Sequence, residues 1–389
     1  MGKRKGTVIR VGIAGQGRSG YSIHTAWLRK ATDKYAIVGV ADQIEERRRD
    51  AERELGVQTH EDYRQLIDAG GIDLFVNALP TPLHVPATLA ALKAGLHVVC
   101  EKPAAPTVKE LDRMTAAARR SGTVLAPFQN NRLQPFFDKI REVIDSGVLG
   151  DIIHIRSVWG SFSRRWDWQT YQCNYGGALY NTGPHAVDQA VMLFGEREEP
   201  KVFCKMEAQN AFGGDANDHC ALTIYGSQSP TIEILISSYL AYVQDELYTI
   251  SGTKGGLTGS GTKLTWRYFD PTKAPRQRVW KRWSEDRAYP SETLPWVEKT
   301  WEVDASVASG AASGYTLPSY EIARKVFYDN VYDVLCGRGK LIITVPQVRR
   351  QIAIMEEAHR QNPLPRRYDA WIPGKGAVRS AKPKKRATR

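Results

Sequence analysis

Lys102 is the first side chain in the sequence that is placed to do chemistry. It stands in Glu101-Lys102-Pro103, directly after the apolar run 95–100, which predicts the carboxyl end of a buried strand. A lysine at that position can donate a hydrogen bond to a substrate hydroxyl and stabilise a carbonyl group as it forms. Pro103 restricts the backbone of Lys102 and helps to fix the direction of its side chain.

His185 is the second such side chain. It lies in the segment 176–188, Gly-Gly-Ala-Leu-Tyr-Asn-Thr-Gly-Pro-His-Ala-Val-Asp. A helix that begins beyond Gly183 places His185 and Asp188 on one face, with Asn181 near its start. A histidine beside polar partners at a helix start is suited to take a proton from an alcohol. The alternative is a structural histidine that only completes the packing.

Three glycines near the N-terminus indicate a phosphate-binding turn. The motif Gly15-Gln16-Gly17-Arg18-Ser19-Gly20 follows the apolar stretch 8–13 and precedes a helical pattern. Gly15 permits a tight turn, Gly17 lets the backbone approach a pyrophosphate, and Gly20 lets the helix pack closely on the strand. The unpaired N–H groups of the helix start can then bind the anion. The alternative is a turn of the same shape that binds nothing.

Asp42 indicates which dinucleotide binds. It follows the apolar segment 37–41 and lies about 20 residues beyond Gly20, the spacing expected for the acid that binds the adenosine ribose. Its carboxylate accepts hydrogen bonds from ribose hydroxyls and repels a 2′-phosphate, so we expect NAD rather than NADP. The arginines 47–49 offer an alternative partner for a 2′-phosphate, but they also fit the exposed face of a helix.

The elements that must position these residues follow two patterns. From residue 7 to about 128, short apolar runs alternate with helical patterns, which predicts βαβ units and a parallel sheet. Longer strands such as 202–207 and 220–225 then alternate apolar with polar residues, which predicts an antiparallel or mixed sheet with one covered face. The stretch 270–314 shows no clear periodicity, and we expect an ordered excursion or lid there.

The composition is that of a globular protein with two domains, because 389 residues are 42% hydrophobic and 25% charged. The net charge of +12 comes largely from residues 1–10 and 374–389, which hold basic side chains and no acids. These ends are expected to be disordered, so a basic face for nucleic acid is not predicted.

No apolar run approaches the roughly 20 residues of a transmembrane helix, and no signal peptide is recognisable. We therefore expect a cytoplasmic protein with no membrane partner. The five cysteines are scattered and form no Cys-x-x-Cys pair, which favours reduced thiols over a disulfide framework or a zinc site.

Taken together, these motifs resemble those of the Gfo/Idh/MocA family, named for glucose-fructose oxidoreductase and inositol dehydrogenase. The resemblance rests on the glycine turn, the segment 77–84, Glu101-Lys102-Pro103, Asn131-Arg132 and the segment 176–188, and it spans residues 7–365. It implies an α/β protein with a Rossmann domain over 1–128, and over 129–373 an α/β domain with a large open, mostly antiparallel sheet, followed by the basic tail 374–389. That second domain would bind substrate and support a homodimer or homotetramer.

The resemblance also implies roles for single residues. Lys102 and His185 match the family's catalytic lysine and histidine, and Asn181 falls where many members have aspartate. Asparagine can only donate or accept hydrogen bonds, so either His185 carries the proton transfer alone or the substrate needs a neutral partner there. The residues expected to bind the cofactor are Gly15, Gln16, Gly17, Arg18, Ser19, Gly20, Asp42, Leu79, Pro80, Thr81, His84, Glu101 and Lys102. Those expected to bind substrate are Lys102, Arg132, Trp166, Asn181, His185 and Asp188; no metal site is expected.

The expected reaction is the NAD-dependent oxidation of a secondary hydroxyl of a sugar, glycoside or cyclitol to a ketone, with His185 taking the proton and Lys102 polarising the carbonyl. The indoles of Trp159, Trp166 and Trp168 suit a sugar ring, although ordinary packing at a domain junction explains them equally well. Two alternatives stay open. One is an NAD-using glycosidase or lyase that oxidises the sugar only transiently, and the other is a non-catalytic NAD-binding sensor.

Overall fold

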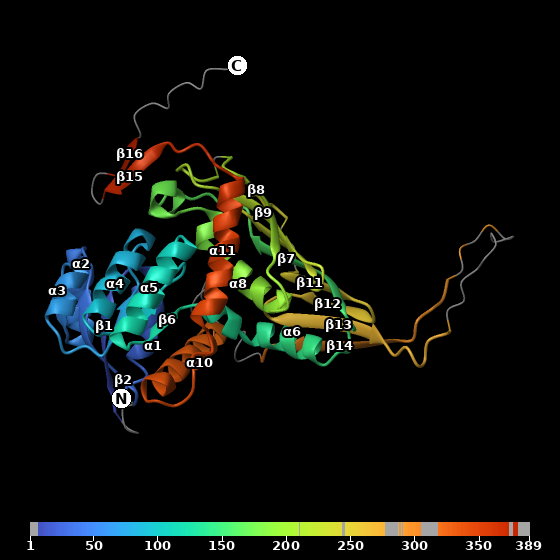
Figure 1. The fold of residues 1–389 in the computed structure, drawn as a ribbon, viewed down its shortest axis with the longest axis horizontal. Coiled ribbons are helices and arrows are strands. Elements are labelled where there is room, and N and C mark those ends of the chain that lie inside the picture. The colour runs from blue at the N-terminus through green and yellow to red at the C-terminus, as the bar shows by residue number, and fades with distance from the viewer. Residues whose placement is uncertain are drawn as a thin grey trace, which may run out of the picture.

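Two large sheets with the helices packed on them, and a small sheet of two strands, make up the fold (Figure 1). The computed structural model describes residues 7–209, 211–242, 246–276, 287, 289, 291–304, 318–372 and 376–379.

Six parallel strands form the first sheet, in the order β3-β2-β1-β4-β5-β6. β4 is buried along its whole length, as expected for a strand covered on both faces. The chain runs from β1 outward to β3 and then returns to place β4 on the other side of β1, so a crevice borders the carboxyl ends of these two strands. The strands are β1 (Ile9–Ala14), β2 (Tyr35–Ala41), β3 (Gln58–His60), β4 (Leu74–Asn77), β5 (His97–Cys100) and β6 (Leu125–Pro127).

Helices connect these strands and pack against the sheet. α5 shows how the residues set the ends, because the Thr107 hydroxyl accepts the N–H of Glu110 at the start and Gly122, with a φ of 65°, ends the helix. The helices are η1 (Gly20–Thr25), α1 (Ala26–Leu28), α2 (Glu45–Leu55), α3 (Tyr63–Asp68), η2 (Thr81–Leu83), α4 (His84–Lys93), α5 (Val108–Ser121) and η3 (Asn130–Leu133).

Eight strands form the second sheet, in the order β14-β13-β12-β11-β7-β10-β9-β8, and only the β7–β10 pair is parallel. β9 shows the expected alternation, because Cys220, Leu222 and Ile224 are buried and Tyr225 is exposed. The strands are β7 (Ile152–Gly160), β8 (Lys201–Glu207), β9 (His219–Tyr225), β10 (Thr231–Ser237), β11 (Tyr248–Gly252), β12 (Gly255–Gly259), β13 (Lys263–Phe269) and β14 (Trp296–Glu302).

Helices cover one face of the second sheet and leave the other open. Side chains of α6 (Pro135–Asp145), α8 (Gly183–Phe194) and α11 (Val345–Gln361) share a core with the inward residues of the strands. On the opposite face Phe203 and Tyr225 are exposed. This confirms the predicted α/β fold with a Rossmann domain and an open, mostly antiparallel second sheet. The short helices η4 (Trp168–Thr170), η5 (Gln172–Asn174) and α7 (Ala178–Asn181) precede α8.

The chain returns to the first core after it has built the second sheet. α10 (Pro318–Leu335) lies beside the first sheet in Figure 1, and its buried side chains belong to the same core as β1 and β2. α11 contributes to both cores. The returning side chains in the first core are Phe327, Tyr328, Val331, Tyr332, Leu335, Cys336, Ile343, Val348 and Ile352. All strands of the first sheet thus precede residue 128, where the domain boundary was predicted. The core of the first sheet, however, also includes these later residues.

Two stretches differ from expectation. Within 270–314 the chain forms β14, which pairs with β13; it is almost wholly exposed, so no alternation of apolar residues marks it. Its neighbours 277–286, 288, 290 and 305–314 lie outside the described residues. Within the tail expected to be disordered, β16 (Gly376–Arg379) pairs with β15 (Tyr368–Ile372); residues 374–375 and 380–389 of that tail lie outside the described residues.

None of the helices in the described part of the chain is both long enough and apolar enough to span a bilayer. The five cysteines form no disulfide.

Candidate active site

The glycine turn lies between β1 and η1 and has no room for a side chain at its first and last glycines. Gly15 has a φ of 93°, and a Cβ there would lie 2.4 Å from the carbonyl oxygen of Ala78. A Cβ on Gly20 would lie 1.8 Å from the carbonyl oxygen of Gly15, so both positions require glycine. A Cβ on Gly17 would meet only the guanidinium of Arg47, at 3.6 Å. The backbone at Gly17 therefore borders open space in which an anion can approach it.

Asp42 follows β2 and ties the turn to that strand. One carboxylate oxygen accepts the N–H of Gln16 at 2.7 Å, and the other accepts the N–H of Ile44 at 2.9 Å. The guanidinium of Arg47 lies 3.5 Å from the first oxygen. Asp42 also borders the cleft described next, so its remaining lone pairs can accept hydrogen bonds from a ribose.

A cleft with about 530 Å³ of water-accessible space runs from the glycine turn to the start of α8. Both halves of the molecule line it. Gln16 and Gly20 are buried and do not line it. The predicted cofactor and catalytic residues that border the cleft are Gly15, Gly17, Arg18, Ser19, Asp42, Leu79, Pro80, Thr81, His84, Glu101, Lys102, Asn181 and His185. The fold thus brings together motifs that are far apart in the sequence.

Lys102 follows β5 and reaches across to the second half. Its Nζ donates to the main-chain oxygen of Asn181 at 2.7 Å, and its main-chain N–H donates to a carboxylate oxygen of Glu101 at 2.9 Å. The Lys102–Pro103 peptide bond is cis. Because an ammonium group has three N–H donors, Lys102 keeps donors for a ligand in the cleft.

Glu101 is buried beside Lys102. Burial by itself raises the pKa of this carboxyl, but the hydrogen bond and charge of His24, together with the charge of Lys102, outweigh it and lower the pKa to about 2. His24 Nε2 lies 3.3 Å from Glu101 Oε1. Glu101 is therefore a carboxylate at neutral pH and sets a negative charge next to the Lys102 ammonium.

His185 lies in the first turn of α8 and borders the cleft. Burial, reinforced by the charge of Lys102 and opposed by Glu101, lowers the pKa of His185 to about 3. Its Nδ1 is buried and meets no hydrogen-bond partner among the described residues. The ring is thus neutral at neutral pH and able to accept a proton. Asn181, at the end of α7, stands less than two turns before it.

Arg132 and Asp188 lie together behind the cleft rather than at its surface. Arg132 Nε donates to one oxygen of Asp188 at 2.8 Å, and Nη2 donates to the other. Arg132 is 3% exposed and Asp188 1%. Arg132 also donates to the side-chain oxygen of Gln347 at 2.6 Å. This buried pair joins η3, α8 and α11, and neither residue borders the cleft.

The tryptophan that borders the cleft is Trp168 rather than Trp166, which is 79% exposed. Gln169 follows Trp168 in η4 and also borders the cleft. Its side-chain oxygen accepts from Arg165 at 2.7 Å. Since a guanidinium only donates, this contact leaves the NH₂ group of Gln169 to donate elsewhere.

Asn130 and Phe128 border the cleft although the sequence did not single them out. Asn130 is 5% exposed, and its side-chain amide makes no hydrogen bond with any described residue. Because the residue borders the cleft, this amide can meet a ligand or water there. The polar run 129–132 directly after β6 is the signal that points to it, because polar residues at a strand's carboxyl end face the ligand crevice.

His84 holds the wall of the cleft in place. Its ring nitrogens lie 2.7 Å from the carbonyl oxygen of Pro103 and 2.9 Å from that of Leu79. Burial lowers the pKa of His84. The side chain therefore links the segment 79–84 to the loop that follows Lys102.

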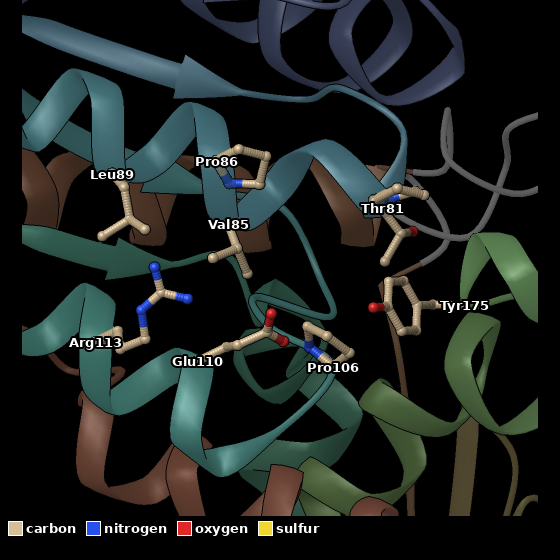
Figure 2. A pocket seen from close by; sticks show the side chains of 9 residues that line it. Thr81, Val85, Pro86, Leu89, Pro106, Glu110, Arg113 and Tyr175 are labelled. Carbon is tan, nitrogen blue, oxygen red and sulfur yellow. The ribbon is translucent and has the colours of Figure 1, made fainter.

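A second, smaller pocket of about 210 Å³ adjoins the cleft at Thr81, which borders both (Figure 2). In Figure 2 side chains of α4 face those of α5, and the Tyr175 ring lies across from Thr81. Tyr175 has a φ of 53°, which is rare for an aromatic residue. The other lining residues are Pro82, Val85, Pro86, Leu89, Pro106, Glu110 and Arg113. Thr81 is thus the residue that the two spaces share.

Two family models match this chain over most of its length. The model described as "Oxidoreductase family, NAD-binding Rossmann fold" matches residues 9–128, and the model described as "GFO/IDH/MocA C-terminal domain" matches residues 137–258. The chain belongs to the Gfo/Idh/MocA family. This confirms the resemblance read from its motifs, and it makes the protein an NAD(P)-dependent oxidoreductase.

Relatives of this Gfo/Idh/MocA protein are only moderately similar. "Uncharacterized oxidoreductase C115.03" of Schizosaccharomyces pombe is 27% identical over 91% of this chain and 97% of its own length. "scyllo-inositol 2-dehydrogenase (NADP(+)) IolW" of Bacillus subtilis is 30% identical over 58% of this chain and 62% of its own. The crystal structure of the WlbA dehydrogenase from Bordetella pertussis, in complex with NADH and UDP-GlcNAcA, superposes with a TM-score of 0.70 at 22% identity, over 93% of this chain and 97% of that one. That last likeness shows a shared fold.

The residues present fit the NAD cofactor of the Gfo/Idh/MocA family. The turn excludes a Cβ at Gly15 and Gly20 and leaves the backbone at Gly17 open, as a pyrophosphate requires. Asp42 borders the same cleft, where its carboxylate can accept hydrogen bonds from the ribose hydroxyls. In the described part of the chain, no group of three or more His, Cys, Asp or Glu side chains is arranged to hold a metal ion.

Proposed function

We propose that this Gfo/Idh/MocA protein oxidises a secondary hydroxyl of a sugar, glycoside or cyclitol to a ketone with NAD. The observation that carries the proposal is the convergence of Lys102 and His185 on the cleft that holds the glycine turn and Asp42. The name of IolW, a scyllo-inositol dehydrogenase, and the sugar nucleotide in the WlbA complex support a polyhydroxyl substrate.

Lys102 and His185 divide the work on the substrate hydroxyl. Bound NAD supplies a nicotinamide ring that accepts a hydride from the carbon. The Lys102 ammonium donates to the hydroxyl oxygen and stabilises the negative charge that develops as the proton leaves. The neutral His185 ring accepts that proton. A His185 pKa of about 3 keeps the ring unprotonated at neutral pH, so it is ready to accept the proton. The same low pKa makes the ring a weak base and lets it release the proton to water readily.

Asn181 serves as a fixed support for Lys102. Its main-chain oxygen accepts from Lys102 Nζ, a contact that any residue at this position can make. Its side-chain amide cannot take up a proton. We therefore assign the proton transfer to His185 alone.

Three other side chains are suited to bind the rest of the substrate. The NH₂ group of Gln169 and the amide of Asn130 offer hydrogen bonds to hydroxyls, and the indole of Trp168 offers an apolar face to a sugar ring. We assign Arg132 and Asp188 a role behind the cleft, where their ion pair holds η3 against α8.

The test is a panel of sugars, cyclitols and methyl glycosides with NAD and NADP, followed by NADH absorbance. We expect Lys102→Ala and His185→Ala to lower kcat by at least about 100-fold. The matched controls Lys109→Ala and His154→Ala, on residues outside the cleft, should keep full activity. Equal activity in Lys102→Ala and wild type would refute the assigned chemistry.

The same panel separates the alternatives. Cleavage of a glycoside without accumulation of NADH would indicate a glycosidase or lyase that oxidises the sugar transiently. Tight NAD binding without turnover of any compound would indicate a sensor.

The open face of the second sheet supports the expectation of a homodimer or homotetramer. Phe203 and Tyr225 are exposed there, and large exposed side chains on a flat sheet are typical of subunit contacts. Light scattering of the purified protein measures the mass directly, and a monomer of 43.5 kDa would contradict the expectation.

A further inference from the structure

A chain of buried hydrogen bonds runs from α10 to the candidate active site. His24 lies in η1, the helix that begins at the end of the glycine turn, and is fully buried. Its Nδ1 lies 2.6 Å from the hydroxyl oxygen of Tyr328, and its Nε2 lies 3.3 Å from Oε1 of Glu101. The other oxygen of Glu101 accepts the main-chain N–H of Lys102. The contacts thus connect the cofactor helix, the returning helix and the end of β5.

The partners of His24 determine where its ring hydrogen lies. An ionised carboxylate can only accept, so Nε2 carries the hydrogen that it donates to Glu101. When the ring carries only that one hydrogen, Nδ1 has a lone pair, and the Tyr328 hydroxyl is the donor that meets it. Burial raises the pKa of Tyr328 well above its ordinary value, so this hydroxyl keeps its hydrogen. Tyr328 therefore selects the tautomer in which His24 donates to Glu101.

Packing prevents the His24 ring from turning away. The ring centroid of Phe128 lies 4.5 Å from that of His24, and the Tyr328 ring meets it edge-on at 6.1 Å. Tyr35 donates its hydroxyl to the main-chain oxygen of Tyr328 at 2.6 Å, which fixes the turn of α10 that carries Tyr328. The relay is thus held by groups from β2, η1 and α10.

We propose that Tyr328 and His24 are positioning residues that hold the Glu101 carboxylate as the fixed counter-charge of Lys102. The proposal rests on the proposed function, because it concerns the lysine assigned to the substrate oxygen. Neither Tyr328 nor His24 borders the cleft, and Tyr328 lies outside the segments that the two family models match. Helix α10, which comes late in the chain, thus controls the charge of Glu101 at the end of β5.

The charges around Glu101 set the expected effect. Without a donor at His24, the hydrogen bond that most strongly opposes burial is lost, and the pKa of Glu101 rises. Protonation of Glu101 would then remove the negative charge beside Lys102 as the pH falls, so the acid limb of the kcat/KM profile should move to higher pH. The titratable groups that interact with Glu101 are His24, His84, Cys100, Lys102, His185 and Tyr328.

The test compares Tyr328→Phe with Tyr332→Phe, a matched variant one turn along α10. The Tyr332 hydroxyl donates to the main-chain oxygen of Thr7 at 3.4 Å and interacts with Cys336 and Arg338 rather than with His24. We expect Tyr328→Phe to lower kcat/KM about tenfold and to shift the acid limb upward, with KM for NAD little changed. Tyr332→Phe should keep the wild-type profile. His24→Gln, whose amide can still donate to Glu101, should retain more activity than His24→Leu.

A second measurement does not depend on turnover. ¹⁵N NMR of the histidine rings in the ligand-free protein, with the His24 signals assigned by their loss in His24→Gln, reports the tautomer. We expect a single Nε2–H form in wild type and Tyr332→Phe, and a mixture of the two tautomers in Tyr328→Phe.

The proposal is wrong if Tyr328→Phe and Tyr332→Phe share one pH profile, or if Tyr328→Phe leaves the His24 tautomer unchanged. If wild type turns over nothing in the substrate panel, the proposed function fails, and the NMR comparison still decides whether Tyr328 orients His24.

Discussion

The Arg132–Asp188 pair offers the sharpest test of how the site is built. In Arg132→Met the carboxylate of Asp188, 1% exposed in the wild type, loses both of its hydrogen bonds to the guanidinium, and Gln347 loses a donor as well. Leaving one charge of a buried pair without its partner costs about 3–5 kcal/mol. We therefore expect the free energy of unfolding of Arg132→Met to fall by that amount at pH 8.

The loss should depend on pH in a defined direction. Burial raises the pKa of Asp188, and Arg132 opposes this, so removing Arg132 raises the folded-state pKa further above the unfolded value. The folded variant then binds a proton more tightly than the unfolded chain. Its deficit is fully present above the folded pKa and shrinks as the pH falls through it.

Urea unfolding followed by tryptophan fluorescence at pH 5 and pH 8 measures both effects. The control is Arg132→Met with Asp188→Leu, which removes both charges and should recover most of the lost stability. A loss below about 1 kcal/mol in the single variant, or an equal loss in the double variant, would refute the reasoning. If the double variant is stable but its KM for substrate rises tenfold or more, the pair contacts substrate after all.

Three further predictions concern the cleft. Gly20→Ala places a Cβ 1.8 Å from the carbonyl oxygen of Gly15 and should abolish NADH binding measured by fluorescence titration. The control Gly122→Asn, at a position in open space with a φ of 65°, should bind NADH as the wild type does. Asp42→Ala should raise KM for NAD about tenfold and narrow the preference for NAD over NADP in initial rates; an unchanged preference would show that Asp42 does not select the cofactor. In the wild type, the His185 pKa lowered to about 3 makes the unfolded state bind a proton before the folded state does, so stability is lost as the pH falls from 6.5 to about 3. His185→Gln should show a smaller loss of stability over this range in thermal melts. Identical pH dependence in the wild type and the variant would contradict the assigned burial.

Local signals predicted the parts of the site that depend on backbone geometry. The glycine turn after β1 and Asp42 after β2 could be recognised because a steric requirement or a strand end ties each to its neighbours in sequence. The convergence of Lys102 and His185 was predictable only through the family resemblance, since no spacing relates residue 102 to residue 185.

What could not be predicted depends on contacts between distant segments or on the orientation of a short turn. Arg132 and Asp188 were predicted to bind substrate, and their pairing with each other in a buried ion pair had no signal in the sequence. The sequence gives no reason to choose between Trp166 and Trp168 as the residue that lines the cleft. The turn at η4 puts Trp168 there. Likewise β14 is an exposed edge strand, so its residues carry no apolar alternation.

The return of α10 to the first core has a consequence for the order in which the protein matures during synthesis. The parallel sheet is complete in sequence at β6, but Phe327 and Tyr328, which fill its core, leave the ribosome only after the whole second sheet has been made. Until then the nascent first half exposes the apolar surface against which these rings pack. A ribosome that stalls between the two sheets would therefore display a dinucleotide-binding half that has its strands but not its full core, and such a chain is a natural client for a chaperone.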